Sequence, residues 1–170
     1  MLKFNADGNV NGGIIKGLTI ANIKSELVDS FPNSQTRERN FKGLKNFLVS
    51  LKDGDVLPLL SKIWLDGSFL TNKINPNDID MVLLFNPSDD NIPKISEFFE
   101  QRRQYFRQIG ETFYCDAYFT VDHTLIPPND SAKASFDKQN KYWMGQFGFD
   151  REGKNKGMLE IGCPEGSELQ

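Results

Sequence analysis

The chain has 170 residues, 25% of them charged, and a net charge of −3, which suits one domain with its own hydrophobic core. Its pI of about 5.2 argues against a surface coated with positive charge for non-specific DNA binding, although a local basic groove is still compatible. Two distant cysteines and one histidine argue against a zinc site and a disulfide framework. We therefore expect a reducing, cytoplasmic protein with no targeting segment and no contact with a membrane.

The first third of the chain predicts a loop followed by two helices. Residues 1–16 are polar and rich in glycine, which is typical of a loop or a short edge strand. A short helix is expected over residues 19–30, because Thr19 can cap its first turn. An amphipathic helix is expected over residues 36–52, where apolar side chains recur three and four positions apart. These side chains are Phe41, Leu44, Phe47, Leu48 and Leu51.

The middle of the chain predicts strands and a helix. A short strand is expected over residues 62–66, and a second one over residues 78–85. The second strand ends in an uninterrupted apolar run, which suggests burial on both faces. Residues 93–109 are expected to form a helix that begins at a proline, and residues 113–121 alternate in the manner of a third strand.

The last third predicts a helix over residues 131–144 and a weaker strand over residues 158–161. Residues 162–170 are expected to be a flexible tail. The mixed order of helices and strands, without repeat or linker, predicts a single α/β (α+β) domain over residues 1–161.

Two aspartates stand where the second strand begins. Because side chains alternate across a strand, Asp78 and Asp80 should share one face and lie close together. Two ionised carboxylates at that distance need a cation between them. Oxygen ligands favour Mg²⁺ or Mn²⁺, and magnesium takes the rest of its shell from water and substrate phosphates. The pair therefore predicts a metal site with a phosphate-bearing substrate.

A third aspartate lies in the strand expected over residues 113–121. Asp116 is flanked by apolar and aromatic residues in mid-strand. If this strand lies beside the one over residues 78–85, Asp116 joins Asp78 and Asp80 as a third ligand. Three carboxylates can hold two divalent ions that clamp the oxygens of a displacement at phosphorus, and Asp116 would then help to activate the attacking hydroxyl.

A glycine-serine pair precedes these aspartates. Gly67 allows close approach of the backbone, and the hydroxyl of Ser68 beside free N–H groups can bind a phosphate. Ser68 can also simply cap a short helix. Nine residues separate Ser68 from Asp78, which is enough for a turn of helix and a loop back to the strand.

This constellation resembles the nucleotidyltransferase superfamily of DNA polymerase beta type. The shared signature is Gly67-Ser68, then Asp78-x-Asp80, then a third acidic residue on a neighbouring strand, here Asp116. In detail the chain is similar to small bacterial and phage nucleotidyltransferase-like proteins. Segments 64–73 (WLDGSFLTNK), 76–80 (PNDID) and 155–161 (NKGMLEI) carry that similarity.

The resemblance implies a nucleotidyltransferase fold, a small mixed sheet flanked by helices. It implies Mg²⁺- or Mn²⁺-dependent transfer of a nucleotidyl group from a nucleoside triphosphate to a hydroxyl. The acceptor would be a protein side chain, a tRNA 3′ end or a small molecule. It also implies a partner protein, such as a toxin or effector, or an RNA, in a toxin-antitoxin or phage-defence system. Gly67 and Ser68 would bind the triphosphate, and Lys73 and Lys156 would contact its phosphates.

Several of these residues have simpler interpretations. Asp78 and Asp80 follow a strong turn signal and can be turn and strand-start residues. Lys73 can be a solvated loop lysine, and the same holds for Lys156. Asp66 is expected to play a structural role by bonding loop amides rather than to bind metal.

Other side chains carry open alternatives. The cluster Arg102, Arg103 and Arg107 is a solvated face or an RNA or partner contact. Cys115 is expected to be a buried filler, and no chemical role is expected for His123. Four aromatic side chains can pack in the core or stack on a base, namely Tyr142, Trp143, Phe147 and Phe149.

Two alternatives to nucleotidyl transfer stay open. The chain can be a binding protein that keeps the fold without turnover, or a phosphate-ester hydrolase that uses the same metals.

Overall fold

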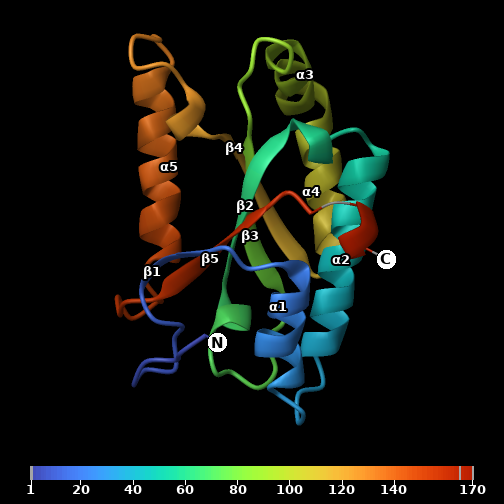
Figure 1. Cartoon of the computed structure of the whole chain (residues 1–170), viewed down its shortest axis with the longest axis vertical. Helices are drawn as coiled ribbons and strands as arrows, with labels where there is room; N and C mark the ends of the chain where they lie inside the picture. The colour runs from blue at the N-terminus through green and yellow to red at the C-terminus, as the bar shows by residue number, and fades with distance from the viewer. Residues whose placement is uncertain (1, 165, 170) are drawn as a thin grey trace.

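One mixed sheet of five strands runs through the molecule (Figure 1). The computed structural model describes residues 2–164 and 166–169. The strands are β1 (Gly13–Lys16), β2 (Leu60–Asp66), β3 (Ile79–Phe85), β4 (Cys115–Val121) and β5 (Gly157–Gly162), and their order across the sheet is β1-β5-β2-β3-β4. The pairs β1/β5 and β3/β4 are parallel, whereas β2 is antiparallel to both of its neighbours.

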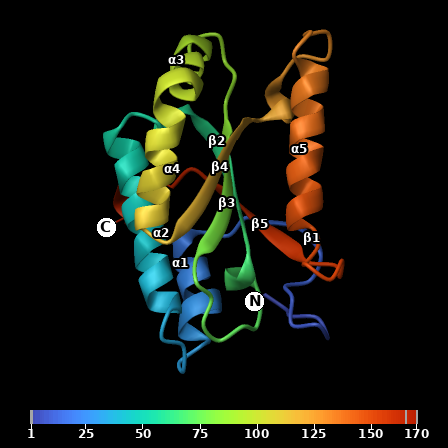
Figure 2. The ribbon, with the colours of Figure 1, turned by 180° about the vertical axis from the view of Figure 1, so that it is seen from behind.

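The helices are divided unequally between the two faces of the sheet (Figures 1 and 2). One face carries α1 (Ile20–Lys24), α2 (Arg37–Asp53), α3 (Ile92–Glu97) and α4 (Arg103–Thr112), and the other carries α5 (Lys133–Phe147). A π-helical turn over Ser25–Asp29 extends α1, and another over Phe98–Arg102 joins α3 to α4. The helix expected over residues 93–109 is therefore two α-helices with a wider turn between them.

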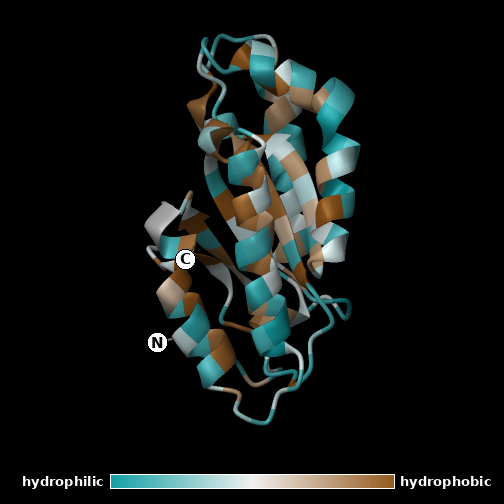
Figure 3. Ribbon diagram, turned by 90° about the vertical axis from the view of Figure 1, so that its right-hand side faces the viewer, coloured by the Kyte–Doolittle hydropathy of each residue, from teal (hydrophilic) through white to brown (hydrophobic). Residues whose placement is uncertain are grey.

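The apolar run in β3 is buried on both faces, as expected. Met81 and Leu83 belong to the main core with the apolar stripe of α2, whereas Val82 and Leu84 pack in a second cluster with Phe147 of α5. Hydrophobic residues accordingly concentrate along the strands and on the inner sides of the helices (Figure 3). Burial of this strand from two sides fixes its register, because a slip of one residue would exchange the two faces.

Thr19 caps α1 as expected. Its side chain accepts a hydrogen bond from the N–H of Asn22, and the side chain of Asn22 in turn accepts from the N–H of Thr19. The strand expected over residues 113–121 begins later, at Cys115, because Tyr114 has a φ of 58° and leaves the extended conformation.

The described part of the segment 162–170 is packed against the domain, although we expected a flexible tail there. Gly162 is the last residue of β5. Residues 166–169 form a 3₁₀ turn beside α2, and Leu169 is buried in the main core. Among the described helices, none is long and apolar enough to cross a bilayer.

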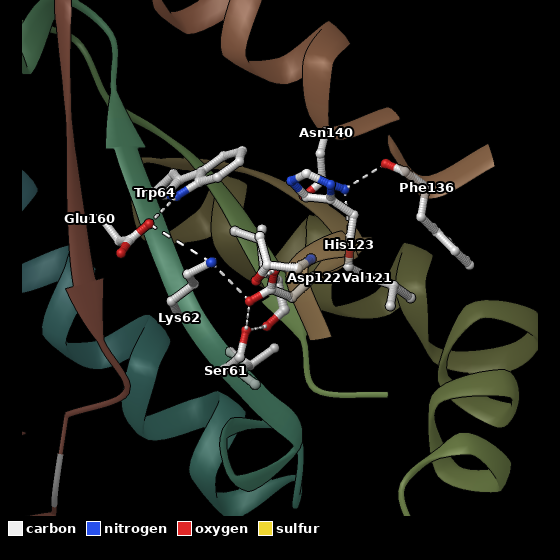
Figure 4. Close-up of polar contacts among 12 residues, drawn as sticks. Ser61, Lys62, Trp64, Val121, Asp122, His123, Phe136, Asn140 and Glu160 are labelled. Carbon is white, nitrogen blue, oxygen red and sulfur yellow. Dashed lines mark hydrogen bonds and ion pairs between the residues drawn. The ribbon is translucent and has the colours of Figure 1, made fainter. Parts of the chain in front are cut away.

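A polar network ties the strands together at one end of the sheet (Figure 4). The buried carboxylate of Asp122 lies 2.8 Å from Nζ of Lys62 and accepts a hydrogen bond from the hydroxyl of Ser61. Lys62 also faces Glu160 of β5, which accepts a hydrogen bond from the indole N–H of Trp64. These contacts hold β2, β5 and the end of β4 in fixed register, and leave the opposite end of the sheet for the site described next.

Candidate active site

Strand pairing brings the acidic residues of three strands together. Asp80 is the direct partner of Asp116 across β3 and β4, and of Asp66 across β2 and β3. Neighbouring strands lie about 4.8 Å apart. Asp78 stands one residue before β3, and all four aspartates line one cleft of about 770 Å³. Asp78, Asp80 and Asp116 thus lie together in this cleft, as we expected.

Asp80 is half-buried beside two other carboxylates. Its pKa is raised above the ordinary value by burial first, and then by the neighbouring charges of Asp78 and Asp116. The charge of Lys156 acts in the opposite direction without cancelling the shift. A carboxylate held in this state is stabilised by any cation that enters the cleft.

The backbone at Gly67 is shaped around this carboxylate. Gly67 has a φ of 82°, which an L side chain rarely adopts, and a Cβ at this position would overlap Oδ2 of Asp80. The glycine therefore lets the chain turn beneath Asp80 and bring Ser68 to the cleft wall, where its side chain is half-buried.

Lys156 makes a contact that the sequence did not predict. Its ammonium lies 2.8 Å from Oδ2 of Asp66, and both side chains are buried. Burial raises the pKa of Asp66 to about 6, although Lys156 opposes that shift. Asp66 is thus held by an ion pair, and its expected structural role stays a prediction. Lys156 lines the cleft with its charge committed to Asp66, and its expected contact with phosphates stays a prediction.

Asp116 is held by one hydrogen bond and one ion pair. The hydroxyl of Tyr118 donates to its Oδ2 at 2.8 Å, and Nη2 of Arg107 lies 3.7 Å from its Oδ1. Burial and the bond to Asp116 raise the pKa of Tyr118 to about 12, so the phenol keeps its proton at neutral pH. Within residues 2–164 and 166–169, no three acidic, histidine or cysteine side chains form a ready metal cage. Asp116 would have to turn from these partners to share an ion with Asp78 and Asp80.

Arg37 is a residue that sequence reasoning missed. Its fully buried guanidinium donates to four backbone oxygens, of which three belong to the loop that follows Gly67; the acceptors are Leu27, Phe69, Thr71 and Lys73. The guanidinium also lies 3.7 Å above the ring of Phe31. Lys73 itself is exposed and lines the cleft. The only sequence signal for Arg37 was its place in the first turn of a helix, where arginine is ordinarily solvated.

Aromatic side chains from α5 and the segment after it form the opposite wall of the cleft. Phe147 is buried and packs in the second hydrophobic cluster. Trp143 is half-buried against Tyr118, with ring centroids 4.4 Å apart. Tyr142 and Phe149 are 57% and 50% exposed and face the same cleft. Of the four candidates, these two have the free surface that stacking on a base requires.

The remaining candidates fall outside the cleft or on its edge. In the arginine cluster, Arg102 donates to the carbonyl of Gly54 and Arg103 is exposed, so Arg107 alone contacts the acidic residues. Cys115 is buried at 1% exposure, as expected of a filler. His123 lies beyond the far end of β4 and bonds to Asp137, away from the cleft.

The protein is a mixed α/β protein with an acidic cleft at one end of its sheet. The chain belongs to a family of unknown function, DUF6932, whose profile matches residues 2–162. No curated protein and no solved structure matches the chain. The matched range includes every strand and every acidic residue of the cleft.

Proposed function

We propose that the protein is a nucleotidyltransferase that moves a nucleoside monophosphate group from a nucleoside triphosphate to a hydroxyl. The observation that carries the proposal is the pairing of Asp80 with Asp116, beside Asp78 and above Gly67. A Gly-Ser turn, an Asp-x-Asp strand and a third aspartate on the next strand are the features by which the chain resembles that superfamily. The nucleotidyltransferase fold is part of this proposal.

The donor set suits a hard divalent cation. Asp78, Asp80 and Asp116 offer only oxygen ligands, which Mg²⁺ and Mn²⁺ prefer. The raised pKa of Asp80 and the space that Gly67 leaves for its carboxylate both fit a site that gains a cation on binding substrate. A bound ion would neutralise charge on the phosphate oxygens during the displacement.

The reaction balances with the groups in the cleft. The acceptor oxygen forms a bond to the α-phosphorus of the triphosphate, and the bond from that phosphorus to the β-bridging oxygen breaks. Diphosphate leaves, and the proton of the acceptor hydroxyl passes to the carboxylate of Asp116. Tyr118 and Arg107 orient that carboxylate before the acceptor binds.

The rest of the cleft suits a nucleotide. Its volume of about 770 Å³ lies in the range of small-molecule sites. Ser68 and Lys73 reach the phosphates from one wall, and the exposed rings of Tyr142 and Phe149 offer a surface for the base. The resemblance further suggests a partner protein or RNA, in a toxin-antitoxin or phage-defence setting.

Transfer of label from α-labelled nucleoside triphosphates to candidate acceptors tests the proposal. The wild type should label an acceptor and release diphosphate, and Asp78→Ala should lower the rate roughly 100-fold or more, because a metal ligand is lost. Asp90→Asn, in an exposed loop, is the matched control and should behave as wild type. Release of orthophosphate in place of diphosphate would identify a hydrolase.

One observation favours a second candidate, a binding protein without turnover. Asp116 already accepts a hydrogen bond from Tyr118 and forms an ion pair with Arg107. For such a protein, a nucleoside triphosphate raises the melting temperature while neither diphosphate nor orthophosphate is released.

A further inference from the structure

A second cavity, of about 550 Å³, adjoins the acidic residues. It shares Asn77, Asp78 and Asp116 with the first cleft, so these residues form a wall between the two spaces. Its other lining residues come from α2, α4 and the start of β4, on the side away from the aromatic wall; they are Arg39, Arg107, Glu111, Tyr114 and Cys115. The cleft and the second cavity therefore meet at Asp78 and Asp116, two of the proposed catalytic residues.

Two guanidinium groups line the second cavity. Nη2 of Arg39 donates to the carbonyl of Asn77 at 2.9 Å, and Nε and Nη2 donate to Oδ1 of Asn40. The guanidinium lies 3.9 Å above the ring of Tyr114, and these contacts hold its plane in place. Arg107 lies 3.7 Å from Asp116, and its buried Nε has no hydrogen-bond partner among the described residues. Glu111 is 3.9 Å from that Nε, which is too far for a hydrogen bond. Arg107 thus lines the cavity with a guanidinium whose contact to Asp116 is an ion pair and not a hydrogen bond.

The backbone beside these arginines is strained. Tyr114 has a φ of 58°, an unusual conformation for a bulky residue, and its carbonyl accepts the N–H of Ile79 at the start of β3. This conformation places the Tyr114 ring under Arg39 while keeping β3 and β4 paired. Strain of this kind persists where the surrounding structure fixes a binding surface.

We propose that the second cavity is the acceptor subsite, and that the acceptor is a hydroxyl compound carrying a phosphate group. Arg39 and Arg107 bind the phosphate, since planar guanidinium groups match phosphate oxygens. The hydroxyl then lies against Asp116, on the opposite side of the acidic wall from the triphosphate. This inference rests on the proposed function and supplies its missing substrate class.

The geometry agrees with the demands of phosphoryl chemistry. Attacking and leaving oxygens lie roughly in line at phosphorus, so acceptor and diphosphate need separate spaces on either side of the reacting group. Asp116 borders both spaces, and its neighbour Arg107 faces the acceptor side. The acceptor proton passes to Asp116 while the new O–P bond forms, as in the scheme above.

The subsite is tested by the Nε–H signals of arginine in ¹⁵N-labelled full-length protein. Inorganic phosphate is titrated in a buffer with Mg²⁺. The signals of Arg39 and Arg107 should shift saturably, and Arg39→Gln or Arg107→Gln should raise the half-saturating phosphate concentration roughly tenfold, because one charge-assisted donor is lost. Arg103→Gln, on the same helix as Arg107 but outside the cavity, should leave it unchanged.

A phosphorylated sugar and a short RNA with a terminal phosphate then identify the source of the phosphate. The inference is overturned if neither signal shifts, or if the shifts do not depend on Arg39 and Arg107. If the protein releases diphosphate but the arginine signals do not shift, the acceptor subsite is wrong and the proposed function is retained. If the signals shift but no diphosphate is released, the cavity binds anions and the proposed function is wrong.

Discussion

At the scale of single residues, the cleft depends on a glycine and on strand register. Alternation along β3 allowed the sequence to place Asp78 and Asp80 on one face. It also predicted that Asp116 would join them if β4 lay beside β3, which it does. The Asp66–Lys156 pair was not predictable, because it depends on β2 lying beside β5, which is distant in the chain.

A comparison of alanine substitutions at Gly67 and Gly153 distinguishes the effect of backbone strain from the effect of a clash with Asp80. Gly67→Ala adds a Cβ that overlaps the Asp80 carboxylate, whereas Gly153 has a similar φ of 77° and open space around it. Gly153→Ala should cost about 1 kcal/mol of unfolding free energy from the backbone alone. Gly67→Ala should cost about 1–3 kcal/mol more and should weaken binding of Mg²⁺ with a nucleoside triphosphate.

Urea unfolding and calorimetric titration provide the two measurements. Equal losses of stability in the two variants, with nucleotide binding intact in both, would show that Gly67 is not fitted to Asp80.

Arg37 also acts as a single residue, by holding the loop that carries Lys73. Arg37→Met should lower the unfolding free energy by about 3 kcal/mol or more, because four backbone carbonyls, two of them in buried hydrogen bonds, lose their donor. Exposed Arg103→Met is the control and should change it by less than about 0.5 kcal/mol. Thermal or urea unfolding measures both values. Similar unfolding free energies for Arg37→Met and Arg103→Met would contradict the role assigned to Arg37.

At the scale of elements, periodicity located helices and strands but not their irregular parts. In the segment 93–109, Phe98 and Phe106 are buried whereas Tyr105 is 60% exposed, and spacing alone does not reveal the π-helical turn at Phe98–Arg102. The late start of β4 was hidden in the same way, since the alternation of residues 113–121 continues through Tyr114. Such features depend on packing against the sheet, which local sequence does not record.

The network around Asp122 makes a prediction about pH. Burial alone would raise the pKa of Asp122, but the bonds from Lys62, Thr124 and Ser61 together hold it below its ordinary value of 3.8. Because the pKa of Asp122 is lower in the folded protein than in the unfolded chain, its ionised carboxylate stabilises the fold above pH 3.8. This stabilisation is lost as the pH falls through the pKa that Asp122 has in the folded protein.

Asp122→Asn should therefore lower the unfolding free energy by about 3 kcal/mol at pH 7, because Lys62 loses its buried partner. The difference from wild type should narrow at pH 3. Urea unfolding at the two pH values, with exposed Asp90→Asn as control, measures the effect. A difference of the same size at both pH values would contradict the role of the Asp122 charge.

At the scale of the whole molecule, the sequence predicted the mixed architecture but not the sheet order. The position of β1 beside β5 joins the two ends of the chain, and no local pattern encodes that pairing. The same long-range arrangement sets α5 alone on its face of the sheet and opens the cleft between its aromatic residues and the acidic strand ends. The site is therefore a property of the complete fold.

The central claim is that the aspartates form a metal and nucleotide site, and anomalous scattering from crystals grown with Mn²⁺ and a non-hydrolysable nucleoside triphosphate tests it most directly. We predict a manganese peak between Asp78 and Asp80, with Asp116 turned toward the ions and the triphosphate along Ser68. A nucleotide bound elsewhere, or manganese absent from these carboxylates, would contradict the account.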